Sequence, residues 1–361
     1  MQKIRAAVCH AFGDPLKIET VQLRIPGPGE VEVTLAACAI CHSDISFIDG
    51  GWGGTLPAVY GHEAAGHVTA TGPGVTRFHK DTPVLVTLIR SCGHCAPCAS
   101  GAPVACNAPP DPDGPLTTVG NENITQAMYC GAFAEKVVVH ESQLVQLPPD
   151  IPLDSASLLS CGVITGAGAV INTANVRPGQ IVVVIGAGGV GLNAIQGAKI
   201  AGASRIVAVD MLPEKLDDAK EFGATNGILA SDPAPWERVK EITGGRLADA
   251  VLVTVGAISV YESAPHYMAT GGRMIMVGMP HSGAMAEYEP VMIAALGQSM
   301  IGSKMGDTVL ARDIPWMVDM YKQGRLKLDE LISGRWPLDQ INEAIADTKK
   351  GSARRNVIVF K

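Results

Sequence analysis

The sequence has few aromatic residues and few charges. Phe, Trp and Tyr together make up 4% of the 361 residues, and Asp, Glu, Lys and Arg make up 17%. The formal net charge is −7 and there is no long run of basic residues, so a nucleic-acid or anionic-membrane surface is not expected. There is also no uninterrupted run of 18 apolar residues, which argues against a membrane-spanning helix.

The first residues of the chain lack the apolar stretch that a secretory signal peptide requires. Lys3 and Arg5 are followed by a short mixed segment up to Phe12. We therefore expect a cytoplasmic protein whose partner is a small molecule.

Small and turn-forming residues are abundant instead. The chain contains 41 glycines and 24 prolines and is 47% hydrophobic, which is typical of a compact globular protein. Its length is sufficient for two domains with substantial cores. Four of the nine cysteines lie between Cys92 and Cys106, and in a reducing compartment this pattern favours metal binding over disulfides.

Short β-like runs separated by Gly and Pro occupy the first 140 residues. Their alternation predicts a mostly β module, with strands at Ile4–Val8, Lys17–Leu23, Glu30–Leu35, Ala64–Ala70, Val84–Leu88 and Phe133–Val139. A helix rich in small residues is expected over Leu153–Thr173. It is followed by the β-branched run Ile181–Ile185, which is typical of a strand buried on both faces.

From this run onward, strand-like and helix-like segments alternate. The pattern predicts a doubly wound parallel α/β sheet of the Rossmann type, built from Ile181–Ile185, a helix at Val190–Ala201, Arg205–Val209, a helix at Pro213–Phe222, Ala250–Val255 and Arg273–Val277. The tail adds helices at Ile314–Gln323 and Leu338–Lys349 and a strand at Asn356–Phe360, which we expect to return to the first module. No internal repeat or low-complexity linker is apparent.

A glycine-rich turn follows the first strand of the second module. Gly186-Ala-Gly188-Gly189-Val190-Gly191 opens a helix, so its backbone N–H groups can bind a pyrophosphate. The next strand ends at Asp210, whose carboxylate would accept hydrogen bonds from ribose hydroxyls and repel a 2′-phosphate, which favours NAD over NADP. The alternative is a simple glycine-rich turn with a solvated Asp.

Two cysteine groups suggest metal. Cys92, Cys95, Cys98 and Cys106 can close a tetrahedral zinc site with no open position, and such a site is structural. A redox-active or disulfide loop and an iron–sulfur cluster remain alternatives. Separately, Cys41, His62 and Cys161 form a three-ligand set that would leave a fourth zinc position open for water or alcohol, although each residue alone is a weak signal.

Taken in order, these motifs resemble the zinc alcohol dehydrogenases of the medium-chain dehydrogenase/reductase superfamily. The resemblance rests on C-H-S-D, G-H-E-A-A-G, C-G-H-C-A-P-C with a later Cys, S-C-G-V-I-T-G-A-G-A and G-A-G-G-V-G, and it covers nearly the whole chain. It implies a GroES-like, mostly β catalytic domain at residues 1–162 and 305–361. A Rossmann NAD-binding domain is implied at residues 163–304.

The resemblance also implies roles for individual residues. Cys41, His62 and Cys161 would bind a catalytic zinc, and the four clustered cysteines a structural zinc. Ser43 would take the hydroxyl proton of the substrate, Asp44 would orient the His62 ring, and Glu63 would lie beneath the metal. The family often has a His three residues after the relay serine, whereas this chain has Ser46, so the proton relay must end differently.

Cofactor and substrate contacts are implied as well. The cofactor positions are His42, Thr165, Gly186, Gly188, Gly189, Val190, Gly191, Asp210, Val255, Val277 and Arg355, of which His42 and Arg355 match phosphate contacts. Trp52 and Leu88 match positions near the substrate pocket, which suggests an apolar site for a primary aliphatic or aromatic alcohol.

The predicted activity is NAD-linked interconversion of an alcohol and its aldehyde or ketone, in a homodimer or homotetramer. Segment Arg312–Leu326 also resembles dehydrogenases that act on hydroxymethyl adducts of a cellular thiol, which is the main alternative. Polyol dehydrogenases commonly have Glu at the position of Cys161, and zinc-free reductases lack the ligand set. A non-catalytic zinc- and nucleotide-binding protein is the alternative of another class.

Overall fold

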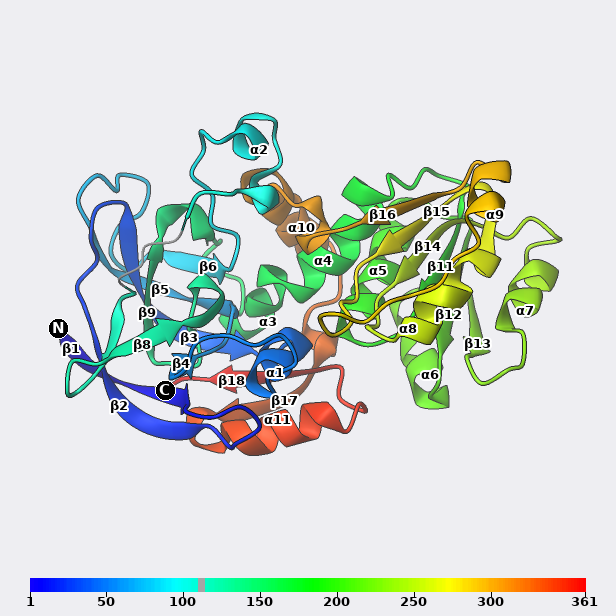
Figure 1. The fold of residues 1–361 in the computed structure, drawn as a ribbon. Helices are drawn as coiled ribbons and strands as arrows, with labels where there is room; N and C mark the ends of the chain where they lie inside the picture. The colour runs from blue at the N-terminus through cyan, green and yellow to red at the C-terminus, as the bar shows by residue number, and fades with distance from the viewer. Residues whose placement is uncertain (110–113) are drawn as a thin grey trace. The chain divides into compact units, whose positions relative to one another are not determined.

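The computed structural model describes residues 1–109 and 114–361 and divides into two compact units. The first unit comprises Met1–Cys161, Val309–Met317 and Leu328–Lys361, and the second comprises Gly162–Thr308 and Val318–Lys327 (Figure 1). The sequence analysis assigned Gly162, residues 305–308 and residues 318–327 to the catalytic domain, whereas the structure groups them with the second unit.

The first unit contains a closed barrel and a seven-stranded sheet. The barrel has the order β1-β2-β7-β8-β4, with β1 (Gln2–Cys9), β2 (Lys17–Leu23), β4 (Ala58–Val59), β7 (Leu116–Thr118) and β8 (Asn123–Gln126). The sheet has the order β10-β6-β5-β3-β18-β17, with β9 also paired to β3. Its strands are β3 (Glu30–Ala39), β5 (Glu63–Thr71), β6 (Pro83–Thr87), β9 (Lys136–His140), β10 (Leu144–Gln146), β17 (Ile332–Pro337) and β18 (Arg355–Val359).

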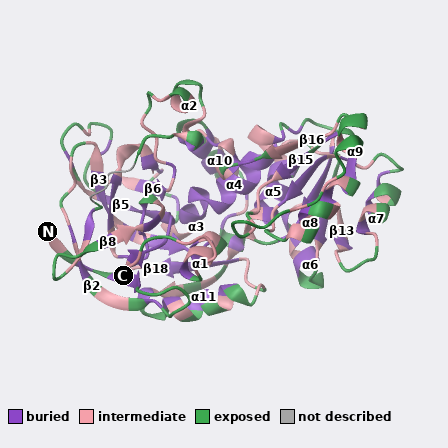
Figure 2. Ribbon diagram, in the orientation of Figure 1, coloured by how far each residue is buried: buried purple, intermediate pink, exposed green. Residues whose placement is uncertain are grey.

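The helices of this unit are short. They are α1 (His42–Ile48), α2 (Ala96–Ala99), α3 (Leu153–Ser157) and α11 (Ile341–Lys349), with single turns η1 (Pro103–Ala105), η2 (Ala127–Tyr129), η3 (Glu141–Gln143), η4 (Leu158–Ser160), η8 (Asp329–Leu331) and η9 (Leu338–Gln340). Helix α10 (Leu310–Lys322) contributes to both units. The barrel and sheet enclose a core of mainly small and β-branched residues. Buried residues are purple in Figure 2.

Strand β3 is the centre of the seven-stranded sheet. One of its edges pairs with β5, while its other edge pairs with β9 along Glu30–Thr34 and with β18 along Ala37–Ala39. The tail of the chain therefore returns to the first unit through β17 and β18. This arrangement places the start of β18 near the end of β3, because the two strands are antiparallel.

The second unit is a six-stranded parallel sheet in the order β13-β12-β11-β14-β15-β16. Its strands are β11 (Ile181–Ile185), β12 (Arg205–Asp210), β13 (Asn226–Leu229), β14 (Ala248–Val253), β15 (Met268–Met276) and β16 (Ser299–Gly302). In chain order this is 3-2-1-4-5-6, which confirms the predicted Rossmann topology. All five residues of β11 are buried, as expected for a strand covered on both faces.

Helices connect these strands. They are α4 (Gly162–Gly168), α5 (Gly189–Ile200), α6 (Pro213–Phe222), α7 (Pro235–Ile242), α8 (Ile258–Ser263) and α9 (Pro290–Ala295), with η5 (Ala169–Thr173), η6 (Ala264–Tyr267) and η7 (Met305–Asp307). The neighbours β11 and β14 are where the strand order reverses. Their carboxyl ends form the position at which sheets of this type bind ligands.

The single helix predicted over Leu153–Thr173 is broken in the structure. Helix α3 and turn η4 end at Cys161, whose φ of −147° and ψ of −68° are not helical, and α4 begins at Gly162. After α4 the chain widens into a π-helix, η5. Apolar periodicity alone does not detect such a break, because every residue on either side of it is suited to a helix.

Over residues 1–109 and 114–361, no individual helix combines the length and apolar character needed to cross a bilayer. The adjoining helical segments Leu153–Ser160 and Gly162–Thr173 meet those criteria only when they are taken together as a bent pair, and most of their residues are buried inside the protein.

Candidate metal centres and nucleotide loop

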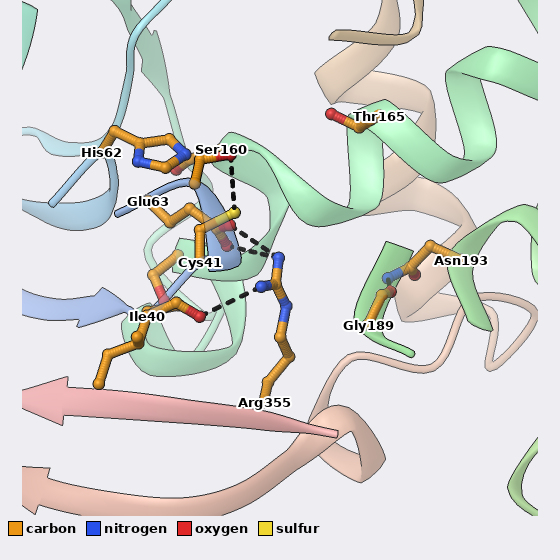
Figure 3. A network of polar contacts seen from close by, with 12 residues as sticks. Ile40, Cys41, His62, Glu63, Ser160, Thr165, Gly189, Asn193 and Arg355 are labelled. Atoms are coloured by element: carbon orange, nitrogen blue, oxygen red, sulfur yellow. Dashed lines mark hydrogen bonds and ion pairs between the residues drawn. The ribbon is translucent and has the colours of Figure 1, made fainter. Parts of the chain in front are cut away.

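Antiparallel pairing of β3 and β5 builds the first cluster. Ala39 near the end of β3 lies opposite Glu63 at the start of β5, so Cys41 and His62 lie at the same end of the sheet. Cys161, in the break before α4, completes the group. The ligand atoms of Cys41, His62, Glu63 and Cys161 all lie within 4.8 Å of one another, and all four residues are buried. Figure 3 shows Cys41, His62 and Glu63 of this group close together.

Asp44 fixes the orientation of the His62 ring. Its Oδ1 lies 3.0 Å from His62 Nδ1, and its carboxylate also accepts the backbone N–H groups of Cys41 and Gly61. Asp44 also forms a capping box with Cys41 at the start of α1, so local helix geometry holds the carboxylate in place. The structure thus places Asp44 against the His62 ring, the residue to which the resemblance assigned it.

The other nitrogen of His62 supports a metal site. Nε2 is fully buried and has no hydrogen-bond partner among the described residues. An orphaned buried nitrogen is costly unless a ligand satisfies it. The ring donates from Nδ1 to a carboxylate, and its Nε2 faces two sulfurs. Zinc-binding imidazoles have this arrangement. Cys41, His62 and Cys161 therefore fit zinc.

The pKa shifts of the cluster also support a metal site. Hydrogen bonding with Cys161 lowers the pKa of the Cys41 thiol well below its usual range, and the same contact raises the pKa of Cys161 well above it. For His62, burial lowers the pKa, but the charge and hydrogen bond of Asp44, together with the neighbouring Cys41, outweigh burial and raise the pKa well above its usual value. A divalent cation bound between Cys41 and Cys161 would stabilise both thiolates.

Arg355 lies beside this cluster, at the start of β18. Its Nη2 donates to both carboxylate oxygens of Glu63, at 2.7 and 3.0 Å, and its Nη1 donates to the carbonyl oxygen of Ile40 at 3.2 Å (Figure 3). The resemblance assigned Arg355 to a cofactor phosphate, and the structure shows that its Nη2 is engaged by Glu63. Burial raises the pKa of Glu63 to about 7, although Arg355 opposes this shift.

Sequence reasoning missed the residues that anchor Cys161. Ser160 Oγ donates to the carbonyl oxygen of Ala64 at 3.1 Å, and Ser160 accepts a hydrogen bond from Thr87 Oγ1 through its own carbonyl at 2.9 Å. These bonds tie the broken helix to β5 and β6. The only signal in the sequence was that Ser160 directly precedes the metal-ligand candidate.

The remaining predicted residues of this unit surround α1. Ser43 Oγ lies 3.6 Å from Cys41 Sγ and is partly exposed, whereas His42 is exposed. Trp52 makes an edge-to-face contact with Phe47, with ring centroids 5.0 Å apart. Leu88 is partly buried against the core of the unit. Ser46, where related enzymes often have His, is also partly exposed.

The four-cysteine lobe forms the second cluster. Cys92, Cys95, Cys98 and Cys106 also lie with all sulfurs within 4.8 Å of one another, but all four are only partly buried. The sulfurs of Cys95 and Cys106 are 3.9 Å apart, close to the edge of about 3.8 Å that a tetrahedron with Zn–S bonds of about 2.3 Å would have. All nine cysteines are free thiols.

Backbone N–H groups prepare these sulfurs for a metal. The N–H of Cys95 donates to the sulfur of Cys92, and the N–H of Cys92 donates to the sulfur of Cys106. Backbone hydrogen bonds from Cys98 and Asn107 lower the pKa of Cys95 to about 6, and burial raises that of Cys98 to about 11. The lobe therefore fits a tetrathiolate zinc.

The glycines of the nucleotide loop have three different requirements. Gly186 has a φ of +95°, which favours glycine, and a Cβ on Gly191 would lie 1.8 Å from the carbonyl oxygen of Gly186. A Cβ on Gly188 would meet no atom within 4 Å. This open position, at the N-cap of α5, is where a pyrophosphate can approach the backbone, so the loop fits a dinucleotide.

Asp210 lies beside this loop. Its Oδ2 accepts the N–H of Ala187 at 2.7 Å, and its Oδ1 accepts the N–H of Leu212 at 3.1 Å, so the side chain is held at the end of β12. Each oxygen keeps a second lone pair that can accept a ribose hydroxyl. The following residue, Met211, is 64% exposed and offers no cation.

The other predicted cofactor residues lie on neighbouring segments of the same unit. Val255 and Val277 follow the ends of β14 and β15 and are partly buried, and Gly189 and Val190 begin α5. Thr165 on α4 is 9% exposed, and its hydroxyl lies 3.8 Å from the sulfur of Met305.

A tight backbone contact supports Thr165. Met305, Gly306 and Asp307 all have positive φ, and a Cβ on Gly306 would lie 2.1 Å from the carbonyl oxygen of Ile164. Asn172 Nδ2 also donates to the carbonyl oxygen of Gly306 at 3.0 Å. The strained turn is thereby held against α4, and this explains why residues 305–308 belong to the second unit.

The sequence analysis did not identify two further residues of this unit. Thr254 Oγ1 donates to the carbonyl oxygens of Ile185 and Gly186, which links the end of β14 to the glycine loop. Lys215 is 3% exposed in the first turn of α6. A lysine is electrostatically unfavourable in a first helical turn, so its position there was a usable signal.

A Rossmann unit with a dinucleotide loop and a β unit with two zinc-compatible clusters define the class of two-domain zinc-binding dehydrogenases. Family models agree: residues 27–149 match the alcohol dehydrogenase GroES-like domain, and residues 189–323 match the zinc-binding dehydrogenase domain. The chain belongs to the zinc-type alcohol dehydrogenases of the medium-chain dehydrogenase/reductase superfamily.

Individual relatives span the whole chain. An NDMA-dependent alcohol dehydrogenase of Amycolatopsis methanolica is 34% identical, with 99% of each chain covered. The crystal structure of a zinc-binding-domain alcohol dehydrogenase protein from Burkholderia ambifaria has a TM-score of 0.95 at 35% identity, covering 100% of this chain and 99% of the other. That of benzyl alcohol dehydrogenase from Acinetobacter calcoaceticus has a TM-score of 0.94 at 31% identity, with complete coverage of both chains.

Proposed function

We propose that this protein is a zinc-dependent, NAD-linked dehydrogenase that interconverts an alcohol and its aldehyde or ketone. The observation that carries the proposal is the buried Nε2 of His62, which has no hydrogen-bond partner among the described residues and faces the sulfurs of Cys41 and Cys161. Three ligands with a total charge of −2 balance Zn²⁺ and leave one position open for substrate. A zinc ion there would act as a Lewis acid that lowers the pKa of the alcohol hydroxyl.

The chain's own residues would organise this chemistry. Asp44 holds the His62 ring in the tautomer that exposes Nε2 to the metal. Ser43, whose hydroxyl is 3.6 Å from Cys41 Sγ, would accept the proton of the alcohol and pass it on. Since Ser46 replaces the histidine that often ends the relay, the proton would leave through partly exposed hydroxyls to solvent.

In the second unit, the glycine loop would hold the pyrophosphate of NAD and Asp210 its adenosine ribose. Bound NAD supplies the nicotinamide ring that accepts the hydride. Thr165, Val255 and Val277 are proposed to contact the cofactor. Lys215 is added to this set because it is only 3% exposed in the first turn of α6, the helix that follows the strand ending in Asp210. Arg355 and His42 retain a proposed cofactor contact, with Arg355 using donors that Glu63 does not occupy.

We assign the four-cysteine lobe to a second, structural zinc. The substrate we propose is a primary aliphatic or aromatic alcohol, because Trp52 with its edge-to-face partner Phe47, together with Leu88, offers apolar surface. The relative from Acinetobacter is named for benzyl alcohol, which supports an aromatic substrate. We propose a homodimer or homotetramer.

The direct test is to quantify zinc and to screen alcohols with NAD. We expect about two zinc ions per chain and NADH formation with benzyl-type alcohols in preference to polyols. Activity that appears only with an added thiol would support a dehydrogenase of hydroxymethyl thiol adducts instead. Bound zinc with no turnover of any alcohol or aldehyde would support a non-catalytic protein.

The choice of electron acceptor needs its own experiment. One relative is named for dependence on NDMA, so the screen should compare NAD, NADP and NDMA as acceptors. Replacing Asp210→Gly should narrow the preference for NAD over NADP, because it removes the carboxylate that repels a 2′-phosphate. Unchanged discrimination in this variant would count against the proposed contact.

A further inference from the structure

A cavity of about 90 Å³ lies beside the four-cysteine lobe. Cys92 and Cys106 form one wall, and the other walls include Arg90, Tyr129 and His140. These residues come from different strands and turns of the first unit. The cavity therefore brings groups from the main body of the unit next to two of the four sulfurs.

The guanidinium of Arg90 is not paired in this cavity. Arg90 is partly buried, and within residues 1–109 and 114–361 its side chain forms no hydrogen bond or ion pair. Other arginines differ: Arg335 binds Asp154, for example. Glu30 is close enough for Arg90 to lower its pKa, but its carboxylate is bound by Arg24 and by the N–H of Gly27.

His140 does not share the charge of Arg90. Its Nδ1 accepts the backbone N–H of Ser142, so the neutral ring carries its proton on Nε2. Burial and the nearby charge of Arg90 lower the pKa of His140, which keeps the ring neutral at pH 7. Arg90 is therefore the only cation among the described residues that line the cavity.

The wall opposite the lobe is held firmly. Met128 and Tyr129 both have positive φ, of 50° and 58°. The buried side chain of Gln143 donates to the carbonyl oxygens of Tyr129 and Thr87, each at 3.0 Å. The buried amide of Gln143 therefore holds this strained turn, and with it the shape of the cavity, in place.

We propose that Arg90 is the counter-charge of the zinc site in the four-cysteine lobe and that it slows the loss of the metal. This inference rests on the proposed structural zinc. When four thiols bind Zn²⁺ and release four protons, the site changes from neutral to a net charge of −2. The cation of Arg90, which lines the same cavity as Cys92 and Cys106, would stabilise the negatively charged metal site more than the metal-free thiols. Arg90 is thus a positioning and charge-balancing residue, without contact to substrate.

The test compares zinc release to a colorimetric chelator from the full-length wild-type protein and three variants. Arg90→Gln should release zinc from the lobe about 10- to 100-fold faster, the range typical for loss of a residue that supports metal ligands. Arg90→Lys, which keeps the charge, should stay close to wild type. Arg325→Gln removes an exposed arginine elsewhere and should have no effect.

Cobalt substitution provides a spectroscopic readout. The thiolate-to-cobalt absorption of the lobe should shift in Arg90→Gln and be unchanged in Arg325→Gln, because Arg90 changes the field at the sulfurs. Equal release rates in all variants, with two zinc ions bound per chain, would overturn this inference and leave the proposed zinc content intact. A lobe that takes up no zinc would overturn both.

One other outcome would contradict the assignment. If inorganic phosphate stabilised the wild type against heat but not Arg90→Gln, while zinc release stayed equal, the cavity would be an oxyanion site. The guanidinium would then be paired with a free anion and not with the metal centre.

Discussion

The two cysteine clusters of the first unit differ in burial and in how the chain assembles them. The four-cysteine lobe lies within 15 consecutive residues, is partly exposed and has sulfur ligands only. The cluster of Cys41, His62 and Cys161 is fully buried and joins residues up to 120 positions apart. One is suited to holding a loop together, and the other to holding a metal where a substrate can bind.

The contacts that support the two clusters also differ: they are local in the lobe and long-range in the buried cluster. Backbone N–H groups of the lobe itself donate to its sulfurs, so the local chain supplies most of what the site needs. The buried cluster depends on side chains from several elements: Asp44 orients His62, Ser160 anchors Cys161, and Arg355 pairs with Glu63. A local cluster can be replaced or lost with little effect elsewhere, whereas a dispersed one is sensitive to every supporting residue.

The largest effect should come from breaking the buried cluster. In Cys161→Ala the activated alcohol loses several kcal/mol of stabilisation, so turnover should fall on the order of 10³-fold, with one zinc ion fewer per chain. Steady-state kinetics and metal analysis would measure this. Cys9→Ala, which removes a buried cysteine outside both clusters, should keep zinc and activity. Full turnover in Cys161→Ala would end the proposed mechanism.

Removing Arg355 should cost stability. Arg355→Met leaves Glu63 buried without its partner, and we expect the free energy of unfolding to fall by about 3–5 kcal/mol in denaturant titrations. The double variant Glu63→Gln/Arg355→Met should recover part of this loss, because it leaves no buried charge. If the double variant were as unstable as the sum of the single ones, the ion pair would not be what holds β18 near the cluster.

Asp44→Asn should weaken the buried site without unfolding the protein. An amide can still accept hydrogen bonds but holds the His62 ring less firmly, so metal affinity or activity should fall about 10- to 100-fold. Zinc release and turnover would be measured together. Asp49→Asn, at an exposed aspartate that pairs with Lys349, is the matched control and should behave as wild type.

The smallest effect on chemistry should follow from damage to the lobe. Cys98→Ser should lose the second zinc and lower the thermal stability of the first unit, while initial turnover at low temperature changes less than about tenfold, or about 1.4 kcal/mol. Metal content, melting temperature and proteolysis within the lobe are the readouts. A loss of turnover as large as that in Cys161→Ala would remove the distinction between the two clusters.

Much of the fold followed from periodicity and motifs. Strands β2 and β11 and helix α6 have the predicted bounds, because β-branched runs and a Pro-to-Gly helix frame are local signals. Short strands such as β4 and β16 were not predicted, since two to four residues carry no clear pattern. The break at Cys161 was also missed, because neighbouring tertiary contacts through Ser160 overrule helix propensity there.

Whether a contact in the site could be predicted depended on how far apart its residues lie in the sequence. The sequence predicted the lobe from the spacing of its cysteines and the glycine loop from its place between a strand and a helix, since both geometries are local. The pairing of Arg355 with Glu63 across 292 positions, and the support of Thr165 by Met305, could not be read from the sequence. Sheet pairing and close packing decide such contacts, and neither leaves a local pattern.

By itself, the amino-acid sequence determined which residues can bind metal and nucleotide and that two modules carry them, because residue chemistry and short-range spacing are written in the chain. Only the tertiary structure decided that Cys41, His62 and Cys161 converge, that Asp44 and Arg355 lie beside them, and that Arg90 lines a cavity with Cys92 and Cys106 of the lobe. The reason is that long-range contacts arise from burial and strand pairing summed over the whole unit, which no short segment specifies.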